Sequence, residues 1–196
     1  MRSKSYLFFF MLLVVATCQA QNKEAVVKPD SLFQARLNSI LADMPHNFTD
    51  LKGKDFFEYN GSYSPRTKAT LSMPNAAISY ITEKFDIVSQ QQYTYHSLWN
   101  YRLKDSTVVR QKADSIGQLI TGTEFKYCER LETKDYSTKA NYFRYFFTTG
   151  KKEGMPDMYN NVYMQITIEK DFIKKGVKGY VIHLEIREEE LPQGSD

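Results

Sequence analysis

The sequence predicts an α+β fold in which two amphipathic helices pack on one face of a largely antiparallel sheet. Two stretches of the 196-residue chain repeat apolar residues at helical spacing. Most of the rest is rich in Tyr, Phe, Thr, Val and Ile, which favour strands, with Gly, Pro, Asn and Asp at the breaks. We expect residues 30–190 to be one domain. Because strand-like segments follow each helix, a tandem duplication of a helix-plus-strands unit, 30–104 and 105–190, is a further hypothesis.

An export signal precedes this domain. Arg2 and Lys4 lead into an apolar run over residues 6–16, which is about half the length that a bilayer-crossing helix needs. We therefore expect residues 1–20 to be a signal peptide that is removed, which leaves no transmembrane segment in the mature chain. The mature protein is then periplasmic or secreted.

The end of the signal allows two kinds of processing. Small side chains at Cys18 and Ala20 predict cleavage before Gln21. The stretch 15–18 resembles a lipoprotein box in its first two positions, although Thr17 departs from the usual Gly, Ala or Ser before the cysteine. In that alternative, a lipid on Cys18 tethers the protein to a membrane surface.

The first helix is predicted from Ser31 onward, after a polar, flexible tether over residues 21–29. Asp30 or Ser31 can cap the free amide groups at its start, and Pro45 stops its growth. Its apolar stripe consists of Phe33, Leu37, Ile40, Leu41 and Met44.

The second helix has the same features as the first. Asp105 and Ser106 can cap its start, and Gly122 lies just past its end. Its apolar stripe consists of Val109, Ala113, Ile116, Leu119 and Ile120.

Eight strands are predicted, and the chain is expected to end in a disordered tail over residues 191–196. Apolar and polar residues alternate along the last two strands, which predicts an antiparallel hairpin with one buried face and one wet face. The predicted strands are 55–59, 67–73, 77–84, 91–103, 124–133, 140–149, 162–170 and 178–188.

Composition and motifs argue against several functions. The formal net charge of +3 includes Arg2 and Lys4 of the leader, so the mature chain is near neutral and lacks the basic surface that nucleic-acid binding requires. The sequence contains no nucleophile elbow, zinc-protease motif or phosphate-binding glycine loop. We expect no cofactor. Removal of Cys18 leaves Cys128 as the only thiol, and a lone cysteine in a strand is typical of packing.

The first candidate binding residues are aromatic. Tyr93, Tyr95, Trp99 and Tyr101 are spaced to lie on one side of a strand. Such a row suits recognition of a peptide or a sugar, because Tyr and Trp offer large contact areas at low entropic cost. The alternative is ordinary cross-strand packing.

The segment 149–161 is the longest irregular connection and contains the second set of candidates. It combines two glycines with Met155, Met158 and Tyr159. Long loops on rigid sheets often carry recognition, although an ordinary wide hairpin connection is the alternative.

The three histidines, His46, His96 and His183, are separated singletons in the sequence. A zinc site draws on several ligands, usually at short spacing, so we expect no metal site. His183 has Glu185 two residues on and is able to meet Glu169 across the hairpin. That group suits either an acid–base pair or a solvated surface cluster.

These features favour an exported, non-enzymatic binding module that uses the aromatic sheet face and the segment 149–161. Its partner is expected to be a protein, a peptide or a glycan of the cell envelope. One alternative is an envelope hydrolase that uses His183 with a nearby Glu, or Cys128 as nucleophile. Another is a structural surface lipoprotein anchored through Cys18.

Overall fold

The computed structural model describes six segments of the chain. The predicted signal peptide with Cys18, the tether and the C-terminal tail lie outside them. The described segments are residues 30–55, 66–85, 91–101, 106–135, 143–174 and 177–188.

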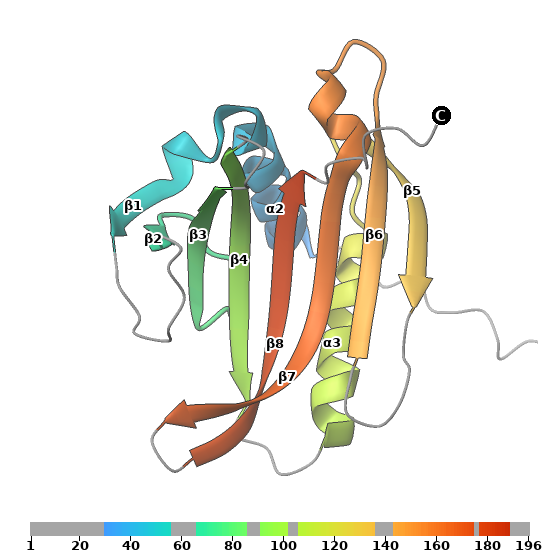
Figure 1. The fold of residues 1–196 in the computed structure, drawn as a ribbon. Helices are drawn as coiled ribbons and strands as arrows, with labels where there is room; N and C mark the ends of the chain where they lie inside the picture. Colours follow the sequence, from blue (N-terminus) through green and yellow to red (C-terminus); the bar gives the residue numbers. More distant parts are fainter. Residues whose placement is uncertain are drawn as a thin grey trace, which may run out of the picture.

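The described residues form one eight-stranded sheet in which all neighbouring strands are antiparallel (Figure 1). The strand order is β1-β2-β3-β4-β8-β7-β6-β5. Together with two α-helices, this sheet confirms the predicted α+β class. The strands are β1 (Lys52–Asp55), β2 (Arg66–Ala69), β3 (Ile78–Phe85), β4 (Gln91–Tyr101), β5 (Cys128–Asp135), β6 (Phe143–Lys151), β7 (Val162–Lys174) and β8 (Val177–Glu188).

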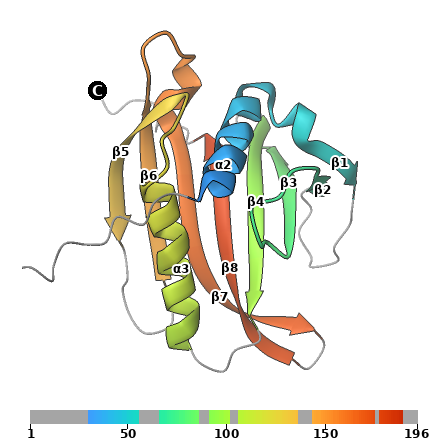
Figure 2. The same ribbon diagram turned by 180° about the vertical axis from the view of Figure 1, so that it is seen from behind.

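Both α-helices lie on the same side of the sheet, behind it in Figure 1 and in front of it in Figure 2. They are α2 (Ser31–Asp43) and α3 (Ser106–Thr121). Asp30 caps α2 as predicted, because its side chain accepts a hydrogen bond from the Leu32 amide at 3.0 Å. Pro45 lies just past the end of α2, where its missing amide hydrogen prevents further helix growth.

The core lies between the helices and the sheet face that they cover. Leu37 and Ile40 of α2 and Val109 and Ile120 of α3 are fully buried there. The sheet contributes alternate residues of its central strands, as the period of a strand requires. The buried residues of those strands on the helix side include Tyr95, Trp99, Met164, Ile166, Ile182, Leu184 and Ile186.

The opposite face carries no helix. The alternation predicts that this face is exposed to solvent, but several of its side chains are buried. Tyr163, Gln165 and Thr167 of β7 point to this side and are all buried. Large neighbouring side chains cover them in part: the Phe146 ring lies 5.1 Å from the Tyr163 ring, and Arg187 lies over that ring. We call this surface the helix-free face.

The middle of the sheet joins strands that are far apart in the sequence. β4 pairs with β8 from Thr94 opposite Arg187 to Tyr101 opposite Tyr180. β8 in turn pairs with β7 over most of its length, which confirms the predicted hairpin. Each half of the chain thus contributes one helix followed by four strands, and the last strands of the two halves are neighbours.

Several predicted boundaries differ from the structure. β2 ends at Ala69 rather than at residue 73, and β5 begins at Cys128 rather than at residue 124. The first strand ends at Asp55, where the predicted strand 55–59 begins, and residues 56–59 lie outside the described part. The predicted loop 149–161 is shorter, because β6 continues to Lys151 and a 3₁₀ helix, η3 (Asp157–Asn161), precedes β7. Gly154, with φ of 78°, makes the turn between them.

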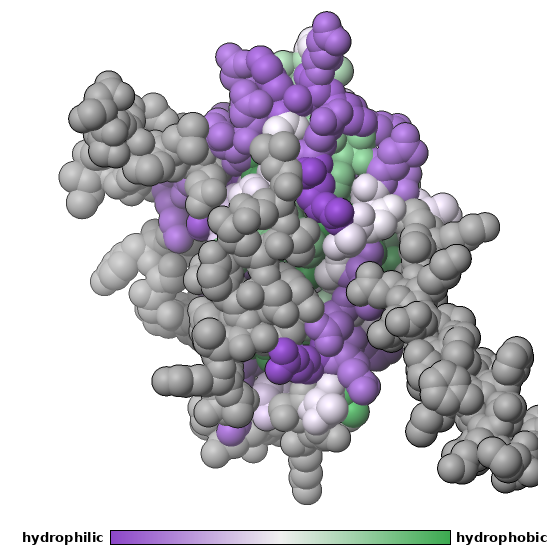
Figure 3. Space-filling view, turned by 90° about the vertical axis from the view of Figure 1, so that its right-hand side faces the viewer, coloured by the Kyte–Doolittle hydropathy of each residue, from purple (hydrophilic) through white to green (hydrophobic). Residues whose placement is uncertain are grey.

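The edge of the sheet at β5 is polar. On the side that faces right in Figure 1, the described surface is mostly hydrophilic with small hydrophobic areas (Figure 3). Glu129 and Arg130 of β5 are exposed there, and charged residues on an edge strand discourage pairing with another chain. Neither described helix combines the length and the apolar composition that a bilayer crossing requires.

Candidate functional site on the helix-free face

Strand alternation and register place the candidate site on the helix-free face. Side chains alternate along β4, so Tyr95 and Trp99 point to the helices while Thr94 and His96 point to the other side. His96 lies directly opposite Glu185 of β8. Glu185 is therefore on the helix-free face of β8, next to the polar residues of β7 on the same face.

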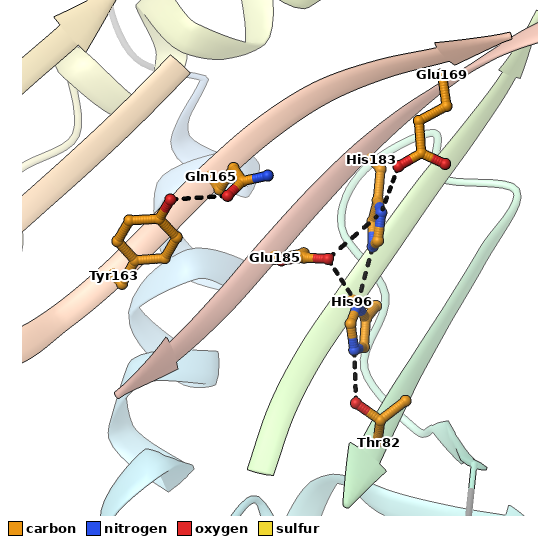
Figure 4. Close-up of polar contacts among 7 residues, drawn as sticks. All are labelled: Thr82, His96, Tyr163, Gln165, Glu169, His183 and Glu185. Carbon is orange, nitrogen blue, oxygen red and sulfur yellow. Dashed lines mark hydrogen bonds and ion pairs between the residues drawn. The ribbon is translucent and has the colours of Figure 1, made fainter. Parts of the chain in front are cut away.

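Two histidines and two glutamates meet on this face. His183 lies two residues before Glu185 on β8 and opposite Thr167 on β7. Glu169 lies two residues after Thr167 and so shares the face. We call His96, His183, Glu169 and Glu185 the histidine–glutamate cluster (Figure 4).

Short contacts connect the members of this cluster. His96 Nδ1 lies 2.8 Å from His183 Nε2. His183 Nδ1 lies 3.7 Å from a carboxylate oxygen of Glu185 and 3.9 Å from one of Glu169. On neighbouring β3, the Thr82 hydroxyl oxygen lies 2.7 Å from His96 Nε2. A continuous chain of contacts thus leads from a hydroxyl through two imidazoles to two carboxylates (Figure 4).

This chain of contacts runs from a buried end to an exposed end. The exposed fraction of the side chain rises from 9% for His96 and 11% for His183 to 22% for Glu185 and 56% for Glu169. A solute therefore meets the Glu169 end first.

Burial keeps His96 uncharged. It lowers the pKa of His96 well below the ordinary value of 6.5, and the charges of His183, Arg66 and other nearby cations lower it further. A neutral imidazole has one nitrogen that donates a hydrogen bond and one that accepts. If His96 Nε2 accepts from the Thr82 hydroxyl, His96 Nδ1 must donate to His183. The tautomers of the two rings are therefore coupled.

Glu169 sets the outer end of this arrangement. A hydrogen bond with His183 lowers the pKa of the Glu169 carboxyl, although burial opposes that effect. An ionised carboxylate only accepts, so His183 Nδ1 must carry the proton in that bond. When the His183 ring is neutral, its Nε2 accepts from His96 Nδ1. Thr82 then donates to His96, His96 donates to His183, and His183 donates to Glu169.

Two arginine–tyrosine stacks flank the cluster. The Arg66 guanidinium carbon lies 5.2 Å from the centre of the Tyr80 ring, and that ring stacks on His96 at 4.6 Å. The Arg187 guanidinium carbon lies 4.7 Å from the Tyr163 ring. Arg187 Nε is buried and has no hydrogen-bond partner in the described part of the chain. The stacks therefore place basic and aromatic side chains beside His96 and near Glu185.

The aromatic row that the sequence singles out lies on the helix-covered face. Tyr95 is fully buried and Trp99 is nearly so. Their polar atoms are satisfied inside the protein: the Tyr95 hydroxyl donates to the Leu71 carbonyl at 2.9 Å, and the Trp99 indole donates to the Pro74 carbonyl at 3.0 Å. This burial favours core packing, the alternative interpretation of the row.

The ends of the row are less enclosed. Tyr93 is half-buried, and the Lys52 ammonium lies 4.0 Å from the centre of its ring. Tyr101 pairs with Tyr180 in the strand register, and its side chain lies outside the described part. These residues provide no broad exposed aromatic surface in the described structure.

The segment 149–161 packs onto the end of α2. Tyr159 is buried, donates its hydroxyl proton to the Leu41 carbonyl at 2.9 Å and stacks on Tyr127 with 5.5 Å between ring centres. Met155 and Met158 are half-buried against the core. The apolar residues of this segment therefore anchor it, which favours the hairpin-connection interpretation.

Cys128 is a buried, unpaired cysteine on β5. Burial raises its pKa to about 11, against smaller opposite effects of Thr149 and Lys152. A thiol with this pKa is protonated at neutral pH, and only a thiolate is a good nucleophile. The position therefore suits packing better than catalysis.

The sequence predicts only part of this cluster. His183 lies near Glu169 and Glu185 as expected, whereas nothing in the sequence pattern links His96 and Thr82 to them. His96 and His183 are 87 residues apart and meet only because β4 and β8 are neighbours. The separation of the histidines in the sequence is thus no argument against a metal site.

Comparison of the chain with protein-family models, with curated proteins and with solved structures found no match.

Proposed function

We propose that this chain is an exported, non-enzymatic binding module that contacts its ligand on the helix-free face, around the histidine–glutamate cluster. The leader pattern in residues 1–20 supports export. Both helices occupy the opposite face, so the helix-free face is the broad sheet surface that remains for a ligand.

One observation carries this proposal: the helix-free face holds an exposed carboxylate, Glu169, together with two arginine–tyrosine stacks, one on His96 and one next to Glu185 along β8. Glu169 offers acceptors to solvent, and Arg66 and Arg187 add positive charge near two tyrosine rings. Among the described residues, Leu32 is the only large hydrophobic side chain that is exposed. A polar peptide or glycan of the cell envelope therefore suits this surface better than an apolar ligand.

In this proposal, the aromatic row and the apolar residues of the segment 149–161 stabilise the fold and do not contact the ligand. Tyr95 and Trp99 hold β4 in place from the core side, and Tyr159 holds the segment 149–161 against α2. Met155 and Met158 are half-buried beside it. Direct contact with a ligand is assigned to the helix-free face instead.

Charge reversal at the exposed end tests the proposal. Glu169→Lys should weaken binding of the purified protein to isolated envelope fractions at least about five-fold, because it replaces an acceptor by a cation at the ligand surface. Lys112→Glu, at an exposed position of α3, is the matched control and should bind like the parent. Equal binding by all three proteins, or none by the parent, contradicts the proposal. Treatment of the fractions with protease or glycosidase identifies the ligand class.

Hydrolysis is a second candidate function, favoured by the chain of contacts from Thr82 to Glu169. A hydroxyl next to an imidazole that a carboxylate orients is a common arrangement in hydrolases. However, Thr82 is buried, and the lowered pKa of His96 makes that ring a weak base. Binding is therefore better supported, and a hydrolase activity lost in His183→Gln would reverse this order.

A lipid found on Cys18 by mass spectrometry would instead favour a membrane-tethered surface protein.

We also infer that the two halves of the chain arose by tandem duplication. Each half is one helix followed by four strands, and the strand order mirrors them about the β4–β8 pair. A natural sequence equivalent to one half and similar to both halves would support the duplication.

A further inference from the structure

We propose that the histidine–glutamate cluster binds a divalent first-row transition-metal ion, such as Zn²⁺, through His96 Nδ1, His183 Nε2 and the Glu185 carboxylate. These three side chains place one possible ligand atom each within 4.8 Å of one another. The metal site does not depend on whether the helix-free face also binds an envelope ligand.

The distance between the two facing nitrogens suits a shared ion. His96 Nδ1 and His183 Nε2 are 2.8 Å apart. Two imidazole nitrogens that bind Zn²⁺ at a right angle are about 3.0 Å apart, and about 3.3 Å apart at a tetrahedral angle. A shift of a few tenths of an ångström therefore converts the hydrogen-bonded pair into a pair of ligands. The proton between the nitrogens occupies the place that the ion would take, so on binding it leaves His96 Nδ1 and His96 carries its proton on Nε2, which then donates to Thr82 Oγ1.

The carboxylate ligand lies within reach of the same point. A Glu185 oxygen is 3.9 Å from His96 Nδ1, and the side chain is directly opposite His96 across the β4–β8 pair. At 22% exposure Glu185 is not locked by packing on all sides. A rotation of its side chain brings the oxygen closer to both nitrogens.

The outer nitrogens of both rings already have oxygen partners. A histidine that binds a metal through one nitrogen usually donates the other N–H to an oxygen, which fixes the ring. Thr82 Oγ1 lies 2.7 Å from His96 Nε2, and a Glu169 oxygen lies 3.9 Å from His183 Nδ1. The Thr82 contact holds the His96 ring, and Glu169 lies on the outer side of the His183 ring, so His96 Nδ1 and His183 Nε2 face each other. Thr82 and Glu169 are positioning residues in this arrangement.

The ligand types select the class of ion. Two imidazole nitrogens and one carboxylate are preferred by Zn²⁺ and similar transition ions, whereas Ca²⁺ and Mg²⁺ require mainly oxygen ligands. Three protein ligands leave at least one coordination position for water or a bound molecule, as in open zinc sites.

A second group of metal-type side chains provides an internal control. Asp43, His46 and Asp50 also lie close together, at the end of α2. The His46 side chain is 69% exposed, so its replacement should leave the fold intact. His46 is therefore the matched control histidine.

Calorimetric titration of the metal-free, full-length protein with Zn²⁺ tests the proposal. One ion per chain is expected, with affinity unchanged by excess Mg²⁺. His183→Gln should weaken binding at least about 100-fold, and Glu185→Gln about 10- to 100-fold, whereas His46→Gln should bind like the parent. Circular dichroism of each variant checks that the fold is retained. The titration contains no envelope material, so its result is independent of the test of the proposed function.

Spectroscopy of the parent keeps the test decisive if a variant fails to fold. X-ray absorption of the Zn²⁺-loaded parent should show two imidazoles and oxygen ligands around the ion. The proposal is overturned if the parent binds Zn²⁺ no more tightly than about 1 mM. It is also overturned if binding is lost in His46→Gln and kept in His183→Gln, or if the spectrum shows fewer than two imidazoles.

Discussion

Tyr95 and Trp99 each combine a large buried ring with one polar atom that needs a partner. Both atoms donate to backbone carbonyls in the connection between β2 and β3, at Leu71 and Pro74. Buried aromatic side chains with satisfied polar atoms hold a strand rigidly. His96 lies between these two residues in β4 and points the opposite way, so its position on the helix-free face is set from the core side.

Asp43 is a buried carboxylate at the end of α2. Its Oδ2 accepts a hydrogen bond from the Leu51 amide at 3.0 Å, but its Oδ1 has no hydrogen-bond partner in the described part of the chain. Burial raises the pKa of Asp43 above its ordinary value of 3.8, and the charge of Asp50 raises it further. Folding therefore favours the protonated form of this side chain.

We predict that Asp43→Asn changes how stability depends on pH. The folded chain binds the Asp43 proton more tightly than the unfolded chain does. The stability from this group is therefore complete below pH 3.8 and is lost as pH rises through the raised pKa. The free energy of unfolding of the parent, relative to the variant, should increase as pH falls from about 7 to about 4 in urea denaturation.

A matched variant separates this effect from a general loss of charge. Glu129→Gln removes one negative charge at an exposed position of β5 and should follow the pH dependence of the parent. If the free energy of unfolding of the parent instead decreases relative to that of Asp43→Asn as pH falls, the Asp43 pKa is not raised.

At the scale of the elements, one buried side chain ties α2 to the second half of the chain. Asn38 is 4% exposed, donates to the Glu124 carbonyl at 3.0 Å and accepts from the Lys126 amide at 2.8 Å. These backbone groups lie between α3 and β5, outside both elements. Asn38 supplies the partners that regular structure would otherwise provide.

Asn38→Ala should lower the free energy of unfolding by about 1–3 kcal/mol, because it removes the hydrogen bonds of a buried side chain to the Glu124 carbonyl and the Lys126 amide, which are part-buried. Ser39→Ala is the control: its exposed hydroxyl bonds only to the Ala35 carbonyl within α2, and its loss should change stability by less than about 0.5 kcal/mol. Urea denaturation measures both. Equal effects of the two variants would mean that other contacts hold residues 122–127.

At the scale of the whole molecule, the two halves share one sheet and one core. β4 ends the first half and β8 ends the second, and their pairing forms the middle of the sheet. Tyr95 of the first half and Ile186 of the second lie directly opposite each other on the buried face. Separation would expose both strands along a full edge and open the core.

We therefore predict that neither half folds alone. Fragments 30–104 and 105–190 should each lack a cooperative urea transition by circular dichroism, because each loses a hydrogen-bonding partner of its last strand, β4 or β8. An equimolar mixture should recover the transition of residues 30–190. A cooperative transition in either isolated fragment would identify two independent domains.

The elements of this fold could be predicted because their signals are local. Asp30 and Pro45 bound α2, and Gly122 follows the end of α3, since caps and breakers act within one helical turn. The β7–β8 hairpin was predictable as well, because its strands alternate and are adjacent in the sequence. The same adjacency explains why His183 could be placed with Glu169 and Glu185.

What the sequence determined by itself is therefore the list of helices and strands and the two-sided character of each strand, since both follow from the short periods of the backbone. Only the tertiary structure decided which side of β4 meets the helices and which strand lies beside it. Those choices bury Tyr95 and bring His96 to His183. They depend on pairing between residues about 90 positions apart. The alternation of side chains is the same whichever face is buried, so it carries no information about that pairing.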